Sequence, residues 1–122
     1  MIQKSGPPIG ETIDQGPLER DPKLVEIVRR LVRAYRPERI FLFGSQARGD
    51  TGPDSDYDLL LVVPDDAPVE RRGSTLAYDV LWGTGAAVDA VVYTRSAFES
   101  RRNVASSLPA TALRDGRLLH AG

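Results

Sequence analysis

The sequence lacks cysteine and has a single histidine, His120, close to its C-terminus. Without cysteine the chain forms no disulfide, no thiolate metal site and no cysteine nucleophile. With one histidine, neither a Ser-His-Asp arrangement nor a multi-histidine zinc site is expected. Any metal chemistry must therefore rest on carboxylates, which favour hard ions such as Mg²⁺.

The chain also lacks a dominant charge and a long apolar run. Sixteen basic residues oppose seventeen acidic ones, and the formal net charge is −1. No global field therefore draws the chain to nucleic acid or to an acidic membrane. No run approaches the ~20 apolar residues that span a bilayer, and the N-terminus has no apolar secretion signal. We expect a cytoplasmic protein with no membrane contact and no bound DNA.

The length of 122 residues, of which 41% are hydrophobic, suits one domain with one core. Residues 1–20 are rich in glycine and proline and poor in apolar side chains. Such a composition buries too little surface to order itself. We therefore expect a flexible N-terminal leader over residues 1–20 and a folded domain over residues 21–122.

Strands alternate with helices along the predicted domain. Asp21 and Pro22 are typical of a helix start, and apolar residues at helical spacing continue the helix toward Pro37. Short apolar runs predict strands at 39–43, 59–63, 87–93 and 117–120, and helical patterns cover 68–82 and 96–114. The predicted fold class is α/β, or its α+β variant, with a mixed central sheet flanked by helices.

Gly44 and Ser45 follow the first predicted strand directly. A strand that ends in Gly-Ser and opens into a helical turn presents free N–H groups and a hydroxyl, which suit phosphate oxygens. The simpler interpretation is that Gly44 only makes a turn and Ser45 only caps a helix. The pair by itself does not decide between the two.

Asp56 and Asp58 stand two residues apart at the start of a strongly apolar strand. Side chains at this spacing project from the same face, with Tyr57 on the other. Two adjacent carboxylates repel each other, so a bound divalent cation explains them better than a core role does. The alternative is a solvated acidic loop, but the buried character of residues 59–63 favours the metal pair.

Asp89 lies within the apolar strand predicted at 87–93. An unpaired buried carboxylate is costly, unless its strand lies beside the Asp56/Asp58 strand and the three groups face one or two Mg²⁺ ions. We therefore expect Asp89 to be buried beside the pair. The alternative is an aspartate near a strand end that reaches solvent.

Taken together, these motifs resemble the DNA polymerase β-like nucleotidyltransferase superfamily. They are Gly44-Ser45, ten intervening residues, Asp56-Tyr57-Asp58 and the later strand residue Asp89. The resemblance covers roughly residues 22–121 and is strongest to the minimal nucleotidyltransferase (MNT) group, which includes MntA-like antitoxins. It implies a fold like the palm of polymerase β.

The resemblance implies transfer of AMP from ATP to an acceptor hydroxyl with two Mg²⁺ ions. The catalytic, metal-binding carboxylates would be Asp56, Asp58 and Asp89. Gly44 and Ser45 would bind the outer phosphates of the nucleotide. Asp89 would bind the second ion and help to activate the acceptor hydroxyl.

Stand-alone MNT proteins of this size resemble antitoxins that neutralise a HEPN-type toxin by attaching AMP to one of its tyrosines. This is the function we expect first. A small-molecule transferase resembling the aminoglycoside nucleotidyltransferases is an alternative, although those enzymes carry a further helical domain. A non-catalytic module that only covers a toxin is a third possibility, and the three intact carboxylates argue against it.

Overall fold

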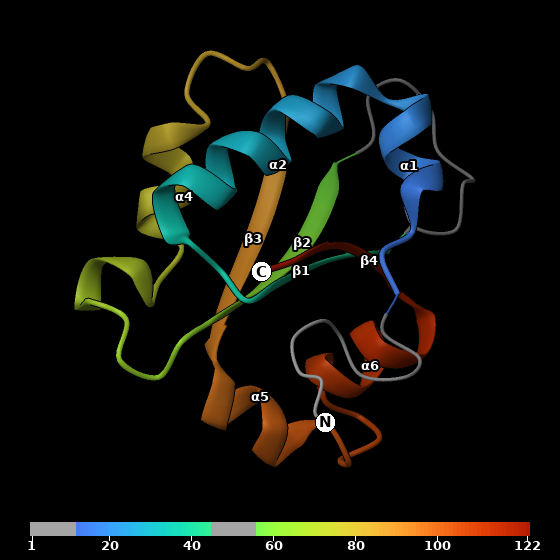
Figure 1. The fold of residues 1–122 in the computed structure, drawn as a ribbon, viewed down its shortest axis with the longest axis vertical. Coiled ribbons are helices and arrows are strands. Elements are labelled where there is room, and N and C mark those ends of the chain that lie inside the picture. Colours follow the sequence, from blue (N-terminus) through green and yellow to red (C-terminus); the bar gives the residue numbers. More distant parts are fainter. Residues whose placement is uncertain (1–11, 45–55) are drawn as a thin grey trace, which may run out of the picture.

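The computed structural model describes residues 12–44 and 56–122. A four-stranded sheet in the order β3-β2-β1-β4 forms its centre (Figure 1). The strands are β1 (Arg39–Phe43), β2 (Tyr57–Val63), β3 (Val88–Thr94) and β4 (Arg117–Ala121). β1 pairs antiparallel with β2 and β4, whereas β2 and β3 are parallel. This mixed sheet confirms the predicted fold class.

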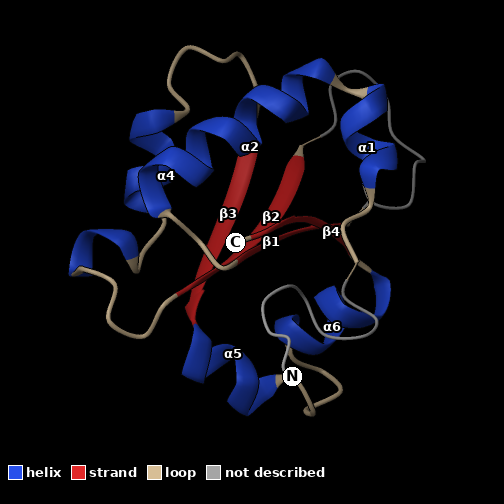
Figure 2. Cartoon of the chain, viewed as in Figure 1, coloured by secondary structure: helices blue, strands red, loops and turns tan. Residues whose placement is uncertain are grey.

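Helices cover both faces of the sheet (Figure 2). They are α1 (Gln15–Arg20), α2 (Pro22–Tyr35), α4 (Thr75–Val80), α5 (Arg95–Arg101) and α6 (Leu108–Asp115), with a short 3₁₀ helix at Val69–Arg71. One buried cluster joins α2 and α4 to one face, and a second joins α5 and α6 to the other. None of the helices in the described ranges is long and apolar enough to cross a membrane.

Helix α2 begins and ends where the sequence indicates. The Asp21 carboxylate accepts hydrogen bonds from the N–H groups of Lys23 and Leu24, at 3.1 and 3.2 Å. Arg36 ends the helix in the left-handed conformation, with φ of 49°, and donates its N–H to the Val32 carbonyl. Both ends of α2 are therefore capped by local hydrogen bonds.

The expectation of a flexible leader over residues 1–20 is wrong for residues 12–20, the part of it that the structure describes. Helix α1 occupies Gln15–Arg20, and the Asp14 side chain caps it at the Gly16 N–H. The Asp14 N–H also donates to the Leu118 carbonyl at 2.8 Å, and Pro17 is buried. These tertiary contacts order a segment whose composition alone predicts none. Residues 1–11 lie outside the described ranges.

The two later helical predictions are each divided in the structure. The pattern over 68–82 forms the 3₁₀ helix and then α4, with Gly73 between them. The pattern over 96–114 forms α5 and α6, because Ser107 accepts a hydrogen bond from the Ala110 N–H and starts a new helix with Pro109 in its first turn.

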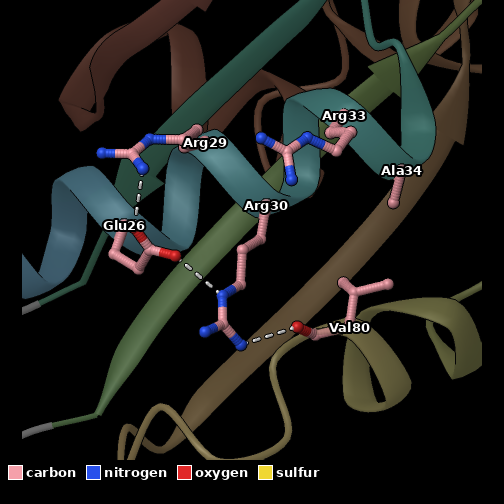
Figure 3. A pocket seen from close by; sticks show the side chains of 6 residues that line it. All are labelled: Glu26, Arg29, Arg30, Arg33, Ala34 and Val80. Atoms are coloured by element: carbon pink, nitrogen blue, oxygen red, sulfur yellow. Dashed lines mark hydrogen bonds and ion pairs between the residues drawn. The ribbon is translucent and has the colours of Figure 1, made fainter.

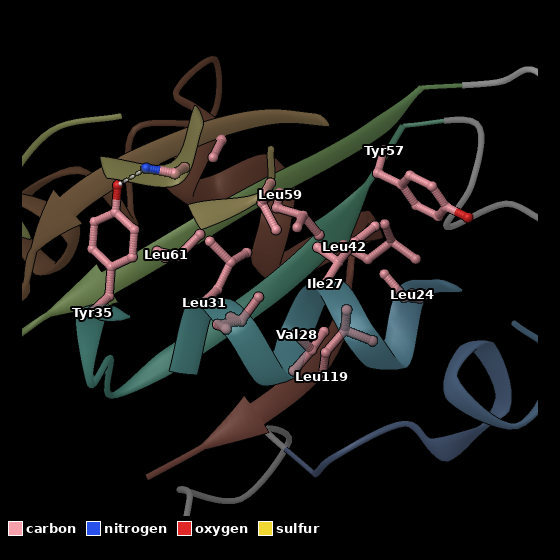
Figure 4. Close-up of a cluster of buried hydrophobic side chains, with 14 of the residues drawn as sticks. Leu24, Ile27, Val28, Leu31, Tyr35, Leu42, Tyr57, Leu59, Leu61 and Leu119 are labelled. Atoms are coloured by element: carbon pink, nitrogen blue, oxygen red, sulfur yellow. Dashed lines mark hydrogen bonds between the residues drawn. The ribbon is translucent and has the colours of Figure 1, made fainter. Parts of the chain in front are cut away.

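Tyr35 and Tyr57 lie at opposite ends of the buried cluster between α2 and the sheet (Figure 4). Leu24, Ile27 and Leu31 of α2 pack there against alternate side chains of β1 and β2. The Tyr35 hydroxyl donates to the Gly73 carbonyl at 2.6 Å and accepts from the Ala77 N–H at 2.9 Å. It thereby fastens the end of α2 to the segment that carries α4.

Tyr35→Phe is expected to lower the free energy of unfolding by about 2 kcal/mol. The change leaves the Ala77 N–H and the Gly73 carbonyl without this partner, and an unsatisfied buried polar group costs about 1–3 kcal/mol. Urea unfolding followed by circular dichroism measures the loss. An unchanged midpoint would mean that these groups find other partners.

Candidate active site

Three strands bring the candidate residues together at one end of the sheet. Asp58 of β2 pairs with Phe43 of β1 on one side and with Asp89 of β3 on the other. Phe43 is the last residue of its strand, and Asp58 and Asp89 are each the second. In-register neighbours project from the same face of a sheet, so the two carboxylates stand side by side.

Gly44 makes a close approach to Asp58 that only glycine allows. Its φ is +76°, in the left-handed region, and a Cβ placed on it would lie 2.5 Å from the Asp58 Oδ2 atom. Any other residue would combine an unfavourable backbone conformation with a clash. The family resemblance implies that Gly44 binds the outer phosphates of a nucleotide. In the structure, the space that a side chain at position 44 would need is occupied by Asp58, one of the proposed metal ligands.

The environment of Asp58 disfavours a charged carboxylate. Burial is the largest cause of a raised pKa at Asp58, and the negative charges of Asp89 and Asp56 raise it further. Within residues 12–44 and 56–122, no hydrogen bond or ion pair joins the side chains of Asp56, Asp58 and Asp89 to a donor. The negative charges of Asp56, Asp58 and Asp89 therefore repel one another, and a bound divalent cation would remove this repulsion.

Asp89 is exposed rather than buried, which corrects the sequence-based expectation. β3 is an edge strand, and most of its side chains are only half-buried. An apolar run in the sequence does not distinguish an edge strand from a central one, so the sequence overestimates the burial of Asp89. The alternative of a strand-end aspartate that reaches solvent describes Asp89 better, although it still lies beside Asp58.

Asp56 precedes the first residue of β2, and its side chain is exposed. Within the described ranges, no three carboxylate or imidazole groups are gathered closely enough to hold one metal ion. The structure thus brings Asp58 and Asp89 together and does not bring Asp56 into a preformed group of three. Two carboxylates still fit Mg²⁺, which usually completes its oxygen shell with water and substrate phosphates.

Ser45, the predicted phosphate-binding hydroxyl, lies outside the described residues. Its role, like the metal and nucleotide roles of the other site residues, stays a prediction.

The sequence model of the nucleotidyltransferase domain family matches residues 22–116. This range is most of the chain and includes Gly44, Ser45, Asp56, Asp58 and Asp89. The chain belongs to this family. No curated protein matches it closely. Among solved structures, it is similar to a Sulfolobus solfataricus protein provisionally classed as a nucleotidyltransferase. The two are 24% identical, with 86% of this chain and 83% of that chain covered and a TM-score of 0.54.

A second similar structure is a toxin–antitoxin complex with AMP-PNP. The identity is 23%, with 80% of this chain and 73% of that chain covered and a TM-score of 0.53. At this identity both structures support the fold. The nucleotidyltransferase domain therefore has a mixed sheet flanked by helices, as these neighbours do.

Tyr57 belongs to the Asp56-Tyr57-Asp58 motif of this nucleotidyltransferase domain, but the motif by itself assigns it no role. Its side chain is 7% exposed, and its hydroxyl donates to the Asp21 Oδ2 atom at 2.5 Å. The available signal was the alternation of β2, which places Tyr57 on the face opposite Asp58. Its partner Asp21, however, lies 36 residues away and could not be identified from the pattern.

A pocket of about 500 Å³ lies at the surface between α2 and α4. Figure 3 shows that Arg30 reaches across it from α2 toward the Val80 carbonyl. Its guanidinium donates to Glu26 at 2.9 Å and to the carbonyls of Val80 and Trp82 at 3.1 and 3.3 Å. Arg30 therefore joins the two helices and is occupied by contacts within the chain. None of the candidate site residues lines this pocket.

Proposed function

We propose that this nucleotidyltransferase domain transfers AMP from ATP to a hydroxyl of a partner protein in a Mg²⁺-dependent reaction. The observation that carries the proposal is the juxtaposition of Gly44, Asp58 and Asp89 at the ends of three adjacent strands. The raised pKa of Asp58 supports it, because like charges beside a partly buried carboxylate are typical of a cation site.

Each residue has a separate role in this proposal. Asp56 and Asp58 hold Mg²⁺ against the triphosphate, and Gly44 and Ser45 contact its outer phosphates. Asp89 faces the acceptor, takes part in holding a second Mg²⁺ and helps to orient the attacking hydroxyl. Bound Mg²⁺ would neutralise charge on the phosphoryl group and lower the pKa of the attacking hydroxyl. The hydroxyl would give up its proton to Asp89, and its oxygen would form a bond to the α-phosphorus as the bond to pyrophosphate breaks.

The acceptor that we propose is a tyrosine of a HEPN-type toxin. The similar toxin–antitoxin structure with AMP-PNP supports a toxin partner and a nucleotide ligand. Exposed large side chains support a protein partner independently. Trp82 is 86% exposed and Tyr78 is 59% exposed, both on α4 or just after it. Tryptophan and tyrosine are enriched at protein interfaces.

The test is to mix the purified chain with the protein encoded by the adjacent gene, ATP and MgCl₂. Intact mass spectrometry is expected to show the partner heavier by AMP units, and peptide mapping should place them on tyrosine. Omission of MgCl₂ or addition of EDTA should abolish the mass gain.

The alternatives give different results. AMP added to an aminoglycoside, with the partner unmodified, would indicate a small-molecule transferase. Neutralisation of a toxic partner with no mass gain would indicate a non-catalytic binding module. Either result would contradict protein modification, and a partner modified without Mg²⁺ would contradict the role of the carboxylates.

A further inference from the structure

We infer that the Tyr57–Asp21 hydrogen bond positions the Asp56–Asp58 segment for metal binding. Tyr57 and Asp21 are then positioning residues that act through the carboxylates on either side of Tyr57. The inference rests on the proposed function, since it concerns how firmly the proposed ligands are held.

The bond joins the first residue of β2 to the cap of α2. Tyr57 occupies the residue between Asp56 and Asp58, and its ring is buried in the cluster that packs α2 on the sheet (Figure 4). Its N–H donates to the Ala87 carbonyl at 2.9 Å, which links it to the residue before β3. Its side chain thus restrains the start of β2 from the face opposite Asp58.

Asp21 is itself held in place on the other side of this bond. Its Oδ1 atom accepts the N–H groups of Lys23 and Leu24, and its Oδ2 atom accepts the Tyr57 hydroxyl. Helix α2 is fastened by its buried side chains and by the contacts of Arg30 with the carbonyls of Val80 and Trp82. A rigid helix therefore supplies the acceptor for Tyr57.

The site has a particular need for such a restraint. Like charges at Asp56, Asp58 and Asp89 repel one another, and Asp58 lies at the start of its strand, where the ladder is weakest. A hydroxyl that bonds a carboxylate on the far face resists displacement of the segment without adding charge to the site. Hydrogen bonds made directly to metal ligands change metal affinity by about 10–100-fold when removed, so a bond that acts through the neighbouring backbone is expected to change it by about tenfold, the lower end of that range.

Tyr57→Phe tests the inference with the whole chain. Calorimetric titration with MnCl₂ in the presence of AMP-PNP is expected to show Mn²⁺ binding about tenfold weaker than in the native chain. In the transfer assay, the apparent KM for Mg²⁺ should rise while kcat at saturating Mg²⁺ changes little, because bound metal can reorganise the carboxylates.

Tyr35→Phe is the matched control, since it removes a tyrosine hydroxyl from the opposite end of the same cluster. It should lower stability at least as much and leave Mn²⁺ affinity unchanged. Asp21→Ser keeps a capping oxygen for α2 but removes the Oδ2 acceptor, so it should reproduce the weaker binding of Tyr57→Phe. The double variant should bind no more weakly than either single one.

The outcomes separate this inference from the proposed function. Native Mn²⁺ affinity in Tyr57→Phe overturns the inference and leaves the proposed function standing. An equal loss in Tyr35→Phe also overturns it, because general loosening would then explain the effect. A native chain that binds neither Mn²⁺ nor AMP-PNP overturns both.

Discussion

Asp58→Asn is expected to lower the rate of AMP transfer about a thousandfold. The change removes a proposed metal ligand that is worth about 4 kcal/mol of transition-state stabilisation, and each 1.36 kcal/mol corresponds to about a factor of ten in rate. The amide keeps nearly the same shape, so the fold should persist. Pyrophosphate release in the presence of the partner protein and saturating MgCl₂ measures the loss.

The same variant should be more stable than the native chain when metal is removed. The pKa of Asp58 is raised above its ordinary value of 3.8 by burial and by its acidic neighbours. Between pH 3.8, where the carboxyl titrates in the unfolded chain, and the raised pKa of Asp58 in the folded chain, the folded state binds more protons than the unfolded state. The free energy of unfolding therefore falls as the pH rises through this range. The asparagine variant lacks this loss. Melting temperatures in EDTA at pH 4 and pH 7 should therefore differ less in the variant.

Asp66→Asn is the control, because Asp66 is an exposed acid in the turn after β2, outside both the proposed site and the α4 surface that carries Tyr78. It should retain native transfer and an unchanged response to pH. Full activity of Asp58→Asn would remove Asp58 from the proposed metal ligands. Collapse of its fold would show that the carboxylate has a structural role that its environment does not explain.

Gly44→Ala is expected to abolish transfer and to lower stability by more than backbone strain alone. A left-handed conformation costs an L-residue roughly 1–2 kcal/mol. The added Cβ would also lie 2.5 Å from the Asp58 Oδ2 atom, so the carboxylate or the end of β1 must move. Because the moved group is a proposed metal ligand, metal binding should weaken as well. Transfer assays, urea unfolding and Mn²⁺ titration measure the three effects.

Gly85→Ala separates the clash from the strain. Gly85 has a φ of +74°, close to that of Gly44, but a Cβ placed on it has nothing within 4 Å. This variant should show the backbone cost alone and keep native metal affinity. Equal effects in the two variants would mean that the approach of Gly44 to Asp58 is unimportant.

Local chemistry explains which elements the sequence predicted well. The start of α2 follows from Asp21 and Pro22, because a capping carboxylate and a proline in the first turn act within a few residues. Strand β1 has the predicted bounds Arg39–Phe43, since a short apolar run ending at glycine leaves little choice. The family followed from the order and spacing of Gly44, Ser45, Asp56, Asp58 and Asp89, and the family model confirms it.

Long-range contacts decided what the sequence predicted poorly. Helix α1 exists within the supposed leader because its segment bonds to β4 and packs on α2, and composition carries no information about such partners. Asp89 is exposed because β3 is the edge strand, a property of strand order rather than of its own residues. The breaks around Gly73 and Ser107 likewise divided two helical patterns that periodicity alone had joined.

The sequence by itself therefore determined the fold class, the family and which residues are candidates for chemistry, because residue type and spacing act locally. Only the tertiary structure decided how those residues meet. It paired Asp58 with Asp89, brought Gly44 against Asp58 and joined Tyr57 to Asp21. These contacts depend on strand order and on helix packing across the sheet, which bring together residues that lie far apart along the chain.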